Sequence, residues 1–264
     1  MTHGKKPLAL PSKPPKTRTI KQSTTDKDSG YMVREGKPKG FFYLDHRTVD
    51  GKCNIITDVH VTAGNVHDSI PYLDRLDRQK SRFNFDVEAV GLDAGYYTAA
   101  ICKGLEDRDI FGAISYRRPN HKKGYFYKRE YQYDAESDEY ICPAGERLIY
   151  STTSREGYRH YTSDSSVCVN CEHLNKCTKN AKHVKTVTRH VWQDYKDRST
   201  EKRLSPSGKV IYKRRKETVE RSFADAKELH GYRYAKYRGI NKVSGQCLLA
   251  AACQNMKKIA QMAA

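Results

Sequence analysis

The chain has 264 residues and carries 49 Lys and Arg against 31 Asp and Glu, which gives a formal net charge of +18. A surplus of this size favours a polyanion such as DNA or RNA as partner, although it could serve solubility alone. Every apolar run is far shorter than the ~20 residues of a membrane span, and no signal peptide is visible, so we expect no membrane partner. The eight cysteines therefore favour reduced thiols or metal ligands over a disulfide scaffold.

The N-terminal part of the chain predicts an arm followed by a hairpin. Residues 1–27 are polar, rich in lysine and broken by prolines, which predicts a disordered basic arm. Gly40–Asp50 is rich in aromatic and β-branched residues and predicts a strand. Asp50-Gly51 is a tight-turn dipeptide, and Asn54–Thr62 alternates apolar with polar residues, as a half-buried hairpin partner does.

Helices and strands are then predicted to alternate, which is typical of an α/β domain. We expect a helix over Asp68–Gln79, with its apolar residues inward, and a helix over Tyr97–Glu106. Between them the apolar stretch from Val87 predicts a buried strand that ends at Asp93, and Asp109–Tyr116 predicts another strand. Open α/β sheets place their chemistry where a central strand ends, so Asp93 is a candidate site residue. The apolar residues expected inward on the first helix are Ile70, Leu73 and Leu76.

Residues 118–205 differ in character, because they are basic, tyrosine-rich and composed of short β-like pieces with four cysteines. These four could supply thiolates to a tetrahedral structural zinc ion, and they could equally be reduced thiols packed in a small insertion. They are Cys142, Cys168, Cys171 and Cys177. The other four cysteines lie in strand or helix patterns and are expected to be small core residues. They are Cys53, Cys102, Cys247 and Cys253.

Two helices are predicted near the C-terminus, over Ile211–Leu229 and Val243–Met262. The first has an apolar stripe formed by Val219, Phe223 and Ala226. We expect the second to bury several small and apolar side chains. They are Cys247, Leu248, Ala251, Ala252 and Ile259.

Glu220 lies on the first of these helices and could join Asp93 in one site. Two carboxylates from separate elements can hold Mg²⁺, and paired metal ions could promote phosphodiester cleavage or strand transfer. The cations Lys216, Arg221 and Lys227 near Glu220 suit phosphate contacts. The alternative is an ordinary charged helix with pairs at i and i+4.

The segment Gly231–Arg238, GYRYAKYR, alternates tyrosine with cations. Aromatic faces can stack on bases while the cations bind phosphates. The alternative, a solvated loop that packs two tyrosines on the domain, fits this pattern as well.

Several motifs together resemble insertion-sequence transposases of the DDE superfamily, from about Ser23 to the C-terminus. The type that is most similar carries a cysteine-bearing insertion before its last acidic residue. The motifs are STTDKDSGYM, HVTAGNVHDS, GLDAGYY, CPAG with CVNC, and RKETVERSFADAK. The resemblance implies a ribonuclease-H-like α/β catalytic domain, in which an acidic triad binds two Mg²⁺ or Mn²⁺ ions that cut and join DNA at the ends of the element. It divides the chain into a first part of the domain, 28–117, a β-rich cysteine-containing insertion, 118–205, and closing helices, 206–264.

The resemblance also assigns site residues. Asp93 matches the second Asp of the triad and Glu220 the Glu. The Tyr-Arg-Glu-Lys signature of the family falls near Tyr212, Arg215 and Lys227. Lys227 keeps the spacing from Glu220 that the signature has, whereas Arg215 lies one residue farther upstream than the signature places its Arg. Five residues are expected to contact DNA: Tyr212, Arg215, Lys216, Arg221 and Lys227. The protein is expected in the cytoplasm, at the nucleoid.

One departure from the family pattern concerns the first Asp of the triad, which lies on a strand ahead of the hairpin. The basic arm has no apolar run and no suitable Asp. We therefore expect a truncated copy that lacks the first strand and is inactive. The alternatives are a DNA-binding remnant or accessory protein that associates with an intact transposase protomer, and a zinc-ribbon nucleic-acid-binding module without catalytic ancestry.

Overall fold

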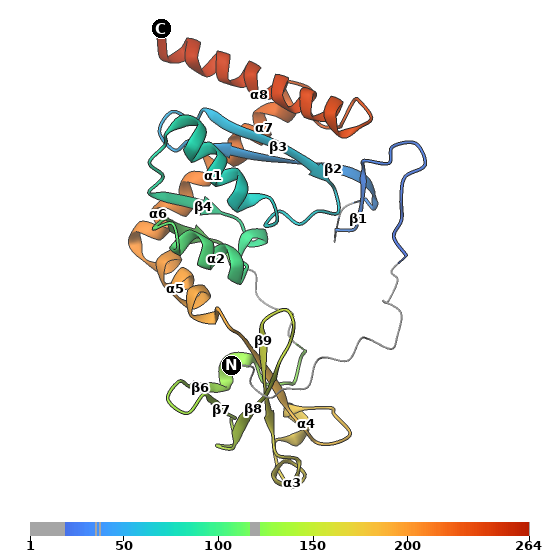
Figure 1. Cartoon of the computed structure of the whole chain (residues 1–264), viewed down its shortest axis with the longest axis vertical. Coiled ribbons are helices and arrows are strands. Elements are labelled where there is room, and N and C mark those ends of the chain that lie inside the picture. Colours follow the sequence, from blue (N-terminus) through green and yellow to red (C-terminus); the bar gives the residue numbers. More distant parts are fainter. Residues whose placement is uncertain (1–18, 35, 37, 117–121, 264) are drawn as a thin grey trace, which may run out of the picture.

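The computed structural model describes residues 19–34, 36, 38–116 and 122–263, so most of the predicted basic arm lies outside the described residues. The fold is mixed α/β (Figure 1). The strands are β1 (Gly30–Met32), β2 (Gly40–Val49), β3 (Ile56–Ala63), β4 (Ala89–Leu92), β5 (Phe111–Ile114), β6 (Gln132–Asp134), β7 (Glu139–Ile141), β8 (Arg147–Thr153), β9 (Tyr158–Ser163) and β10 (Thr186–His190). The α-helices are α1 (Tyr72–Phe83), α2 (Ala99–Glu106), α3 (Ser165–Cys168), α4 (Leu174–Cys177), α5 (Gln193–Leu204), α6 (Pro206–Lys213), α7 (Val219–Leu229) and α8 (Ile240–Ala263). Three short 3₁₀ helices are η1 (Ala94–Tyr96), η2 (Lys128–Glu130) and η3 (Arg214–Lys216).

The predicted hairpin is present as the antiparallel pair β2 and β3. Asp50 fixes the turn, because its carboxylate accepts backbone N–H groups of Lys52 at 2.7 Å and Ile55 at 2.9 Å. Helix α8 packs on β3 and contributes Val243 to a cluster around Val61. The polar face of β3 is also covered, since Arg75 of α1 is buried and forms a 2.7 Å ion pair with Asp58 of β3.

Strands β4 and β5 form a separate two-stranded parallel sheet, linked by α2. Its core includes Ile101, Leu105 and Ile114. The prediction that β4 is buried was wrong in part, because Ala89 is exposed and Leu92 only half-buried. The reason is topological: among the described residues β4 pairs with β5 alone, so one of its two edges has no neighbouring strand.

A five-stranded antiparallel sheet follows, in the order β10-β9-β8-β7-β6. Its core is largely aromatic, with Tyr131, Tyr140 and Tyr161 packed around Leu148. Figure 1 shows these strands at the opposite end of the molecule from α8. Helix α5 returns the chain to the first part of the fold and packs on α2 and β5.

Two predicted helices differ from the observed ones. The helix expected from Asp68 begins at Tyr72, because residues 68–71 form a turn with Pro71 at the N-cap, and Ile70 is 69% exposed instead of inward. The helix expected over Ile211–Leu229 is divided into α6, η3 and α7. The break lies at Thr218, whose φ of −106° and ψ of −98° are not helical.

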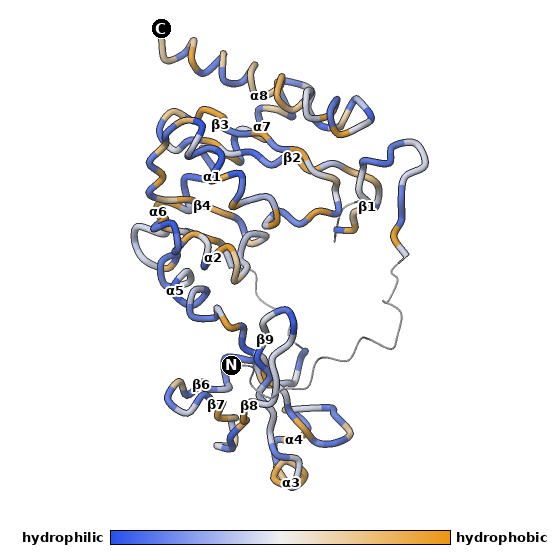
Figure 2. The backbone as a smooth tube through the Cα atoms, viewed as in Figure 1, coloured by the Kyte–Doolittle hydropathy of each residue, from blue (hydrophilic) through white to orange (hydrophobic). Residues whose placement is uncertain are grey.

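Helix α8 contains the predicted range Val243–Met262 but begins at Ile240, and its buried face differs from the predicted one. Cys247 and Ala251 are buried as predicted, whereas Leu248 and Ile259 are 54% and 56% exposed, and Ala252 is exposed as well. The outward face therefore carries large apolar residues, and Figure 2 shows hydrophobic segments interspersed along this helix. None of the described helices is both long enough and apolar enough to cross a bilayer.

Of the four cysteines predicted to lie in the core, two are buried and two are exposed. Cys102 and Cys247 are buried, as expected. Cys53 and Cys253 are exposed, so the prediction was wrong for these two. Cys53 belongs to the turn between β2 and β3, where the chain leaves the core, and Cys253 lies on the outer face of α8.

Candidate active site

Asp93 lies directly after β4, where the sequence predicts it. Its backbone is extended, with φ −81° and ψ 178°, and its carboxylate accepts the N–H of Gly95 at 2.9 Å. This hydrogen bond caps η1 and fixes the carboxylate at the end of the strand. About half of the side chain is exposed, so its oxygens remain accessible to a ligand.

Glu220 lies in the first turn of α7. The break at Thr218 starts a new helix there, and the N-terminal end of a helix favours a negatively charged side chain. Glu220 is half-exposed, like Asp93. The division of the predicted long helix therefore places Glu220 at a helix end.

Arg215 joins the two carboxylates. Its Nη2 lies 3.9 Å from Asp93 Oδ2, and its Nη1 lies 3.6 Å from Glu220 Oε1. The Arg215 side chain is largely buried, and its Nη1 donates to the hydroxyl of Tyr212 at 3.2 Å. A cation between two carboxylates offsets their mutual repulsion. The structure thus brings four predicted site residues into one cluster.

Asp68 is a neighbour of Asp93 that the sequence analysis missed. Gly95 lies between the two carboxylates, because a Cβ added there would be 3.1 Å from Asp93 Oδ1 and 3.3 Å from Asp68 Oδ2. Burial, and then the charge of Asp93, raise the pKa of Asp68. His46 Nδ1 lies 3.6 Å from Asp68 Oδ1. The available signal was the motif HVTAGNVHDS, in which Asp68 was interpreted only as the start of a helix.

A cavity of about 710 Å³ opens beside these carboxylates, between β2 and β4. Its lining includes Asp68, Asp93 and Glu220, together with residues of α1, α6 and α7. Strands β2 and β4 are its two side walls, and no ladder joins them in the described part of the chain.

The side chains at this site fit the chemistry of a divalent cation in part. Carboxylate oxygens are the ligands that Mg²⁺ prefers, and Asp93 and Glu220 provide them. Across the ranges that the structure describes, however, no three His, Cys, Asp or Glu side chains are grouped so that they could hold a metal ion. The assignment of Mg²⁺ or Mn²⁺ to Asp93 and Glu220 therefore stays a prediction.

Replacing Arg215 with Gln should strengthen Mn²⁺ binding. The substitution removes a positive charge about 4 Å from both carboxylates, and a charge at this distance is worth about 1–4 kcal/mol near a protein surface, so we expect a gain of about tenfold. The electron paramagnetic resonance signal of free Mn²⁺ measures the affinity. Arg221→Gln is the control. It removes the same positive charge, but Arg221 Nε donates to Asp225 at 2.9 Å and has no contact with Asp93 or Glu220 among the interactions of the described residues. Equal affinities of the Arg215→Gln variant and the wild type would show that Arg215 does not compete with the ion.

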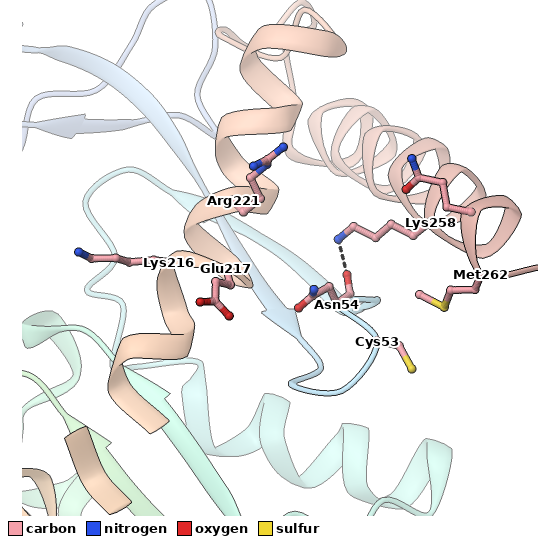
Figure 3. Close-up of a pocket in the computed structure, with 8 residues that line it drawn as sticks. Cys53, Asn54, Lys216, Glu217, Arg221, Lys258 and Met262 are labelled. Atoms are coloured by element: carbon pink, nitrogen blue, oxygen red, sulfur yellow. Dashed lines mark hydrogen bonds between the residues drawn. The ribbon is translucent and has the colours of Figure 1, made fainter. Parts of the chain in front are cut away.

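The cations predicted to contact DNA lie along α7 and its N-terminal approach. Lys216 and Arg221 line a second cavity, of about 430 Å³, together with Lys258 of α8 (Figure 3). Lys258 donates to the backbone carbonyl of Asn54 in the hairpin turn, and burial lowers its pKa. Lys227 is exposed in the last turn of α7. Lys216 and Arg221 thus face a cavity other than the one that Glu220 lines, and Lys227 lies at the opposite end of α7, so contact of these cations with a phosphate backbone stays a prediction.

The four cysteines of the predicted zinc site line one small cavity beside the five-stranded sheet, together with His173. Cys168 Sγ donates to Ser163 Oγ at 3.2 Å, and Cys177 Sγ lies 3.3 Å from the hydroxyl of Tyr131. Burial raises the pKa of Cys177, and so do the nearby thiols of Cys168 and Cys142. The thiols are therefore neighbours, but no described group has the arrangement of a metal site, and zinc stays a prediction.

The fold is a mixed α/β domain. Its candidate site has two carboxylates, Asp93 at the end of β4 and Glu220 at the start of α7. Residues 141–260 match the family model of the transposase DDE domain, and this match supports a DDE transposase. Glu220, Arg215 and the four cysteines lie within the matched range, whereas Asp93 lies outside it. Comparisons with curated proteins and with solved structures gave no significant match.

Proposed function

We propose that the chain is the catalytic domain of an insertion-sequence transposase, with a ribonuclease-H-like fold and a cysteine-bearing insertion. Asp93 and Glu220 serve as two of its catalytic carboxylates. The observation that carries this proposal is their connection through Arg215, which lies 3.9 Å from one and 3.6 Å from the other. The match of residues 141–260 to the transposase DDE domain supports the same conclusion.

Bound Mg²⁺ would supply activation of a nucleophile and stabilisation of the leaving oxygen in phosphodiester cleavage and strand transfer. Asp93 and Glu220 would hold the ion. Arg215 is placed to attract a phosphate to the same point, since guanidinium groups match phosphate geometry. Lys216 and Arg221 would hold the DNA backbone next to Glu220.

We infer that this chain by itself binds DNA but does not complete transposition. Arg215 occupies the position between the two carboxylates and competes with a cation for them. Two carboxylates also hold a pair of metal ions less well than three. Among the described residues, no strand pairs with the outer edge of β4, the strand that ends just before Asp93.

A second candidate function is DNA binding without catalysis. The net charge of +18 favours it, and so does the exposure of Tyr234 and Tyr237 in the segment GYRYAKYR. Aromatic faces that are open to solvent can stack on unpaired bases. The cations of α7 would serve both functions.

Replacing Lys216, Arg221 and Lys227 together with Gln should reduce the salt dependence of DNA binding. Each phosphate contact contributes about 0.9 to the slope of log K against log salt concentration, so we expect the slope to fall by about 2–3. Fluorescence anisotropy of a labelled duplex at several salt concentrations measures the slope. A triple variant at exposed positions next to the five-stranded sheet, with Arg155 in a turn, Lys176 in α4 and Lys182 in a loop changed to Gln, removes the same charge. If both variants lower the slope equally, the DNA contacts are not concentrated on α7.

A further inference from the structure

On the basis of the function proposed above, we infer that the second cavity, between the turn of the hairpin, α7 and α8, binds a backbone phosphate of the DNA. Asp93 and Glu220 do not line this cavity. The DNA strand that reaches the two carboxylates would thus continue across the start of α7 to a second point of contact.

The cavity of about 430 Å³ lies where the β2–β3 turn, the segment that leads into α7 and the last turns of α8 meet. Asn255 of α8 fixes this junction, because its side chain accepts the N–H of Ile56 at 2.8 Å and donates to the carbonyl of Ile56 at 2.9 Å. Lys258 follows three residues later, on the same side of the helix. Figure 3 shows its side chain extending from α8 toward the turn, where the ammonium donates to the carbonyl of Asn54. The site is therefore held in place by contacts that exist without a ligand.

Three cations line the cavity, and two of them have no carboxylate partner. Arg221 pairs with an acidic residue of its own helix, whereas neither Lys216 nor Lys258 forms an ion pair with any residue that the structure describes. The bond to Asn54 uses one of the three donors of the Lys258 ammonium and leaves two for a ligand. Glu217 is the single acidic residue in the described lining, and it is exposed. The surplus of positive charge favours an anion.

The surroundings of Lys258 support the same conclusion. Burial lowers the pKa of its ammonium, Asp225 and Asp50 raise it, and the charges of Arg221 and Arg47 lower it. Arg221 and Lys258 line the same cavity and repel each other. A phosphate between the two side chains would offset this repulsion, because an opposite charge favours the charged form of each.

The chemistry of the lining suits a phosphodiester better than a free nucleotide. None of the described side chains that line the cavity is aromatic, so a base would find no ring on which to stack. Guanidinium and ammonium groups, by contrast, are the usual ligands of phosphate oxygens. These groups bind the backbone of DNA irrespective of its sequence.

The two cavities lie on either side of α7. Glu220 lines the catalytic cavity, and Arg221, the next residue, lines the second one. A helix with its side chains is about 10–12 Å across, and a DNA strand rises about 3.4 Å per nucleotide. A strand that crosses the start of α7 would therefore place phosphates about three nucleotides apart in the two cavities.

The test is alkylation of Cys53 by N-ethylmaleimide in the full chain, with and without a DNA duplex. Cys53 lines the cavity and is exposed. Cys253, which is exposed on the outer face of α8, is the internal reference. With DNA at about ten times its Kd, Cys53 should react about 5–10-fold more slowly and Cys253 at an unchanged rate, as mass spectrometry of the labelled peptides would show.

A pair of neighbouring lysines supplies the matched variants. Lys258→Gln should lower the slope of log K against log salt concentration by about 0.9, because one phosphate contact is lost, and it should weaken the protection of Cys53. Lys257→Gln removes the same charge from an exposed position of α8 that is not part of the lining, and it should behave like the wild type. The protection of Cys53 in the wild type does not depend on the folding of either variant.

The outcomes separate this inference from the proposed function. If DNA binds but leaves the reactivity of Cys53 unchanged, the second phosphate site is wrong and the proposed function stands. Equal salt slopes for Lys258→Gln and Lys257→Gln would also overturn the site. Protection of Cys53 by inorganic phosphate but not by DNA would overturn the assignment to DNA. Failure of the chain to bind the duplex at all would overturn both the site and the proposed function.

Discussion

Replacing Arg47 with Met should lower the free energy of unfolding by about 3–5 kcal/mol, the usual cost of breaking a buried ion pair. The Arg47 side chain is 0% exposed and that of its partner Asp45 9% exposed, and their closest atoms are 2.7 Å apart. Arg47 Nη1 also donates to Ser222 of α7 at 3.2 Å, so it links the hairpin to that helix. Burial raises the pKa of Asp45 while Arg47 lowers it, so the variant would leave this carboxylate without its main compensation.

Urea denaturation followed by circular dichroism measures this change. Arg221→Met is the matched control, because Arg221 pairs with Asp225 on the exposed face of α7, and such pairs contribute about 0.3–0.5 kcal/mol. The double variant Asp45→Asn with Arg47→Met should recover part of the loss, since no buried charge remains. If Arg47→Met costs no more than Arg221→Met, the buried pair does not stabilise the junction of the hairpin and α7.

Asp93→Asn and Glu220→Gln should each weaken Mn²⁺ binding by at least about tenfold, since even second-shell changes at metal sites cost about 10–100-fold. The Arg215→Gln variant is the best background, because its two carboxylates have lost the competing cation. The double variant should bind Mn²⁺ little more weakly than either single variant, because one carboxylate alone holds the ion poorly.

Glu217→Gln is the control for this series, since Glu217 lies near Glu220 in the sequence but lines the second cavity. It should leave the Mn²⁺ affinity close to that of its background. A loss in Asp93→Asn with no loss in Glu220→Gln would show that the two carboxylates do not share an ion.

Much of the fold follows from local sequence patterns. The turn dipeptide at Asp50 and the alternation in the following strand predict the hairpin, because both act over a few neighbouring residues. The apolar run that ends at Asp93 predicts a strand with a carboxylate at its end for the same reason. The structure confirms both features, with β2 paired to β3 and Asp93 directly after β4.

Features that depend on distant packing were not predictable in this way. The break at Thr218 lies within a sequence of ordinary helix formers, and only the structure shows that α7 starts anew there. On α8 the predicted inward residues Cys247 and Ala251 are buried, whereas Leu248, Ala252 and Ile259, which were also predicted inward, are exposed. Small side chains allow a helix to approach a sheet closely. The more apolar Leu248 is left in solvent as a result.

The residue pattern proposed Asp93 and Glu220 as candidates, and the family resemblance assigned them roles. Spacing along the chain cannot show that Asp93 and Glu220 meet, and the ordinary charged helix remained an open alternative. The bridging position of Arg215 and the proximity of Asp68 depend on how β4, α1 and α7 come together, which no local pattern encodes.

The central proposal is a transposase site that binds DNA but is incomplete for catalysis. The most direct test incubates the purified chain and Mg²⁺ or Mn²⁺ with a supercoiled plasmid that carries its gene and the flanking genomic DNA. The double variant Asp93→Asn with Glu220→Gln is treated in parallel, and gels score mobility shift, nicking and joining. We predict a shift of the plasmid, with no nicked, linear or joined product beyond that of the double variant. Cleavage or joining that requires Asp93 and Glu220 would contradict this account.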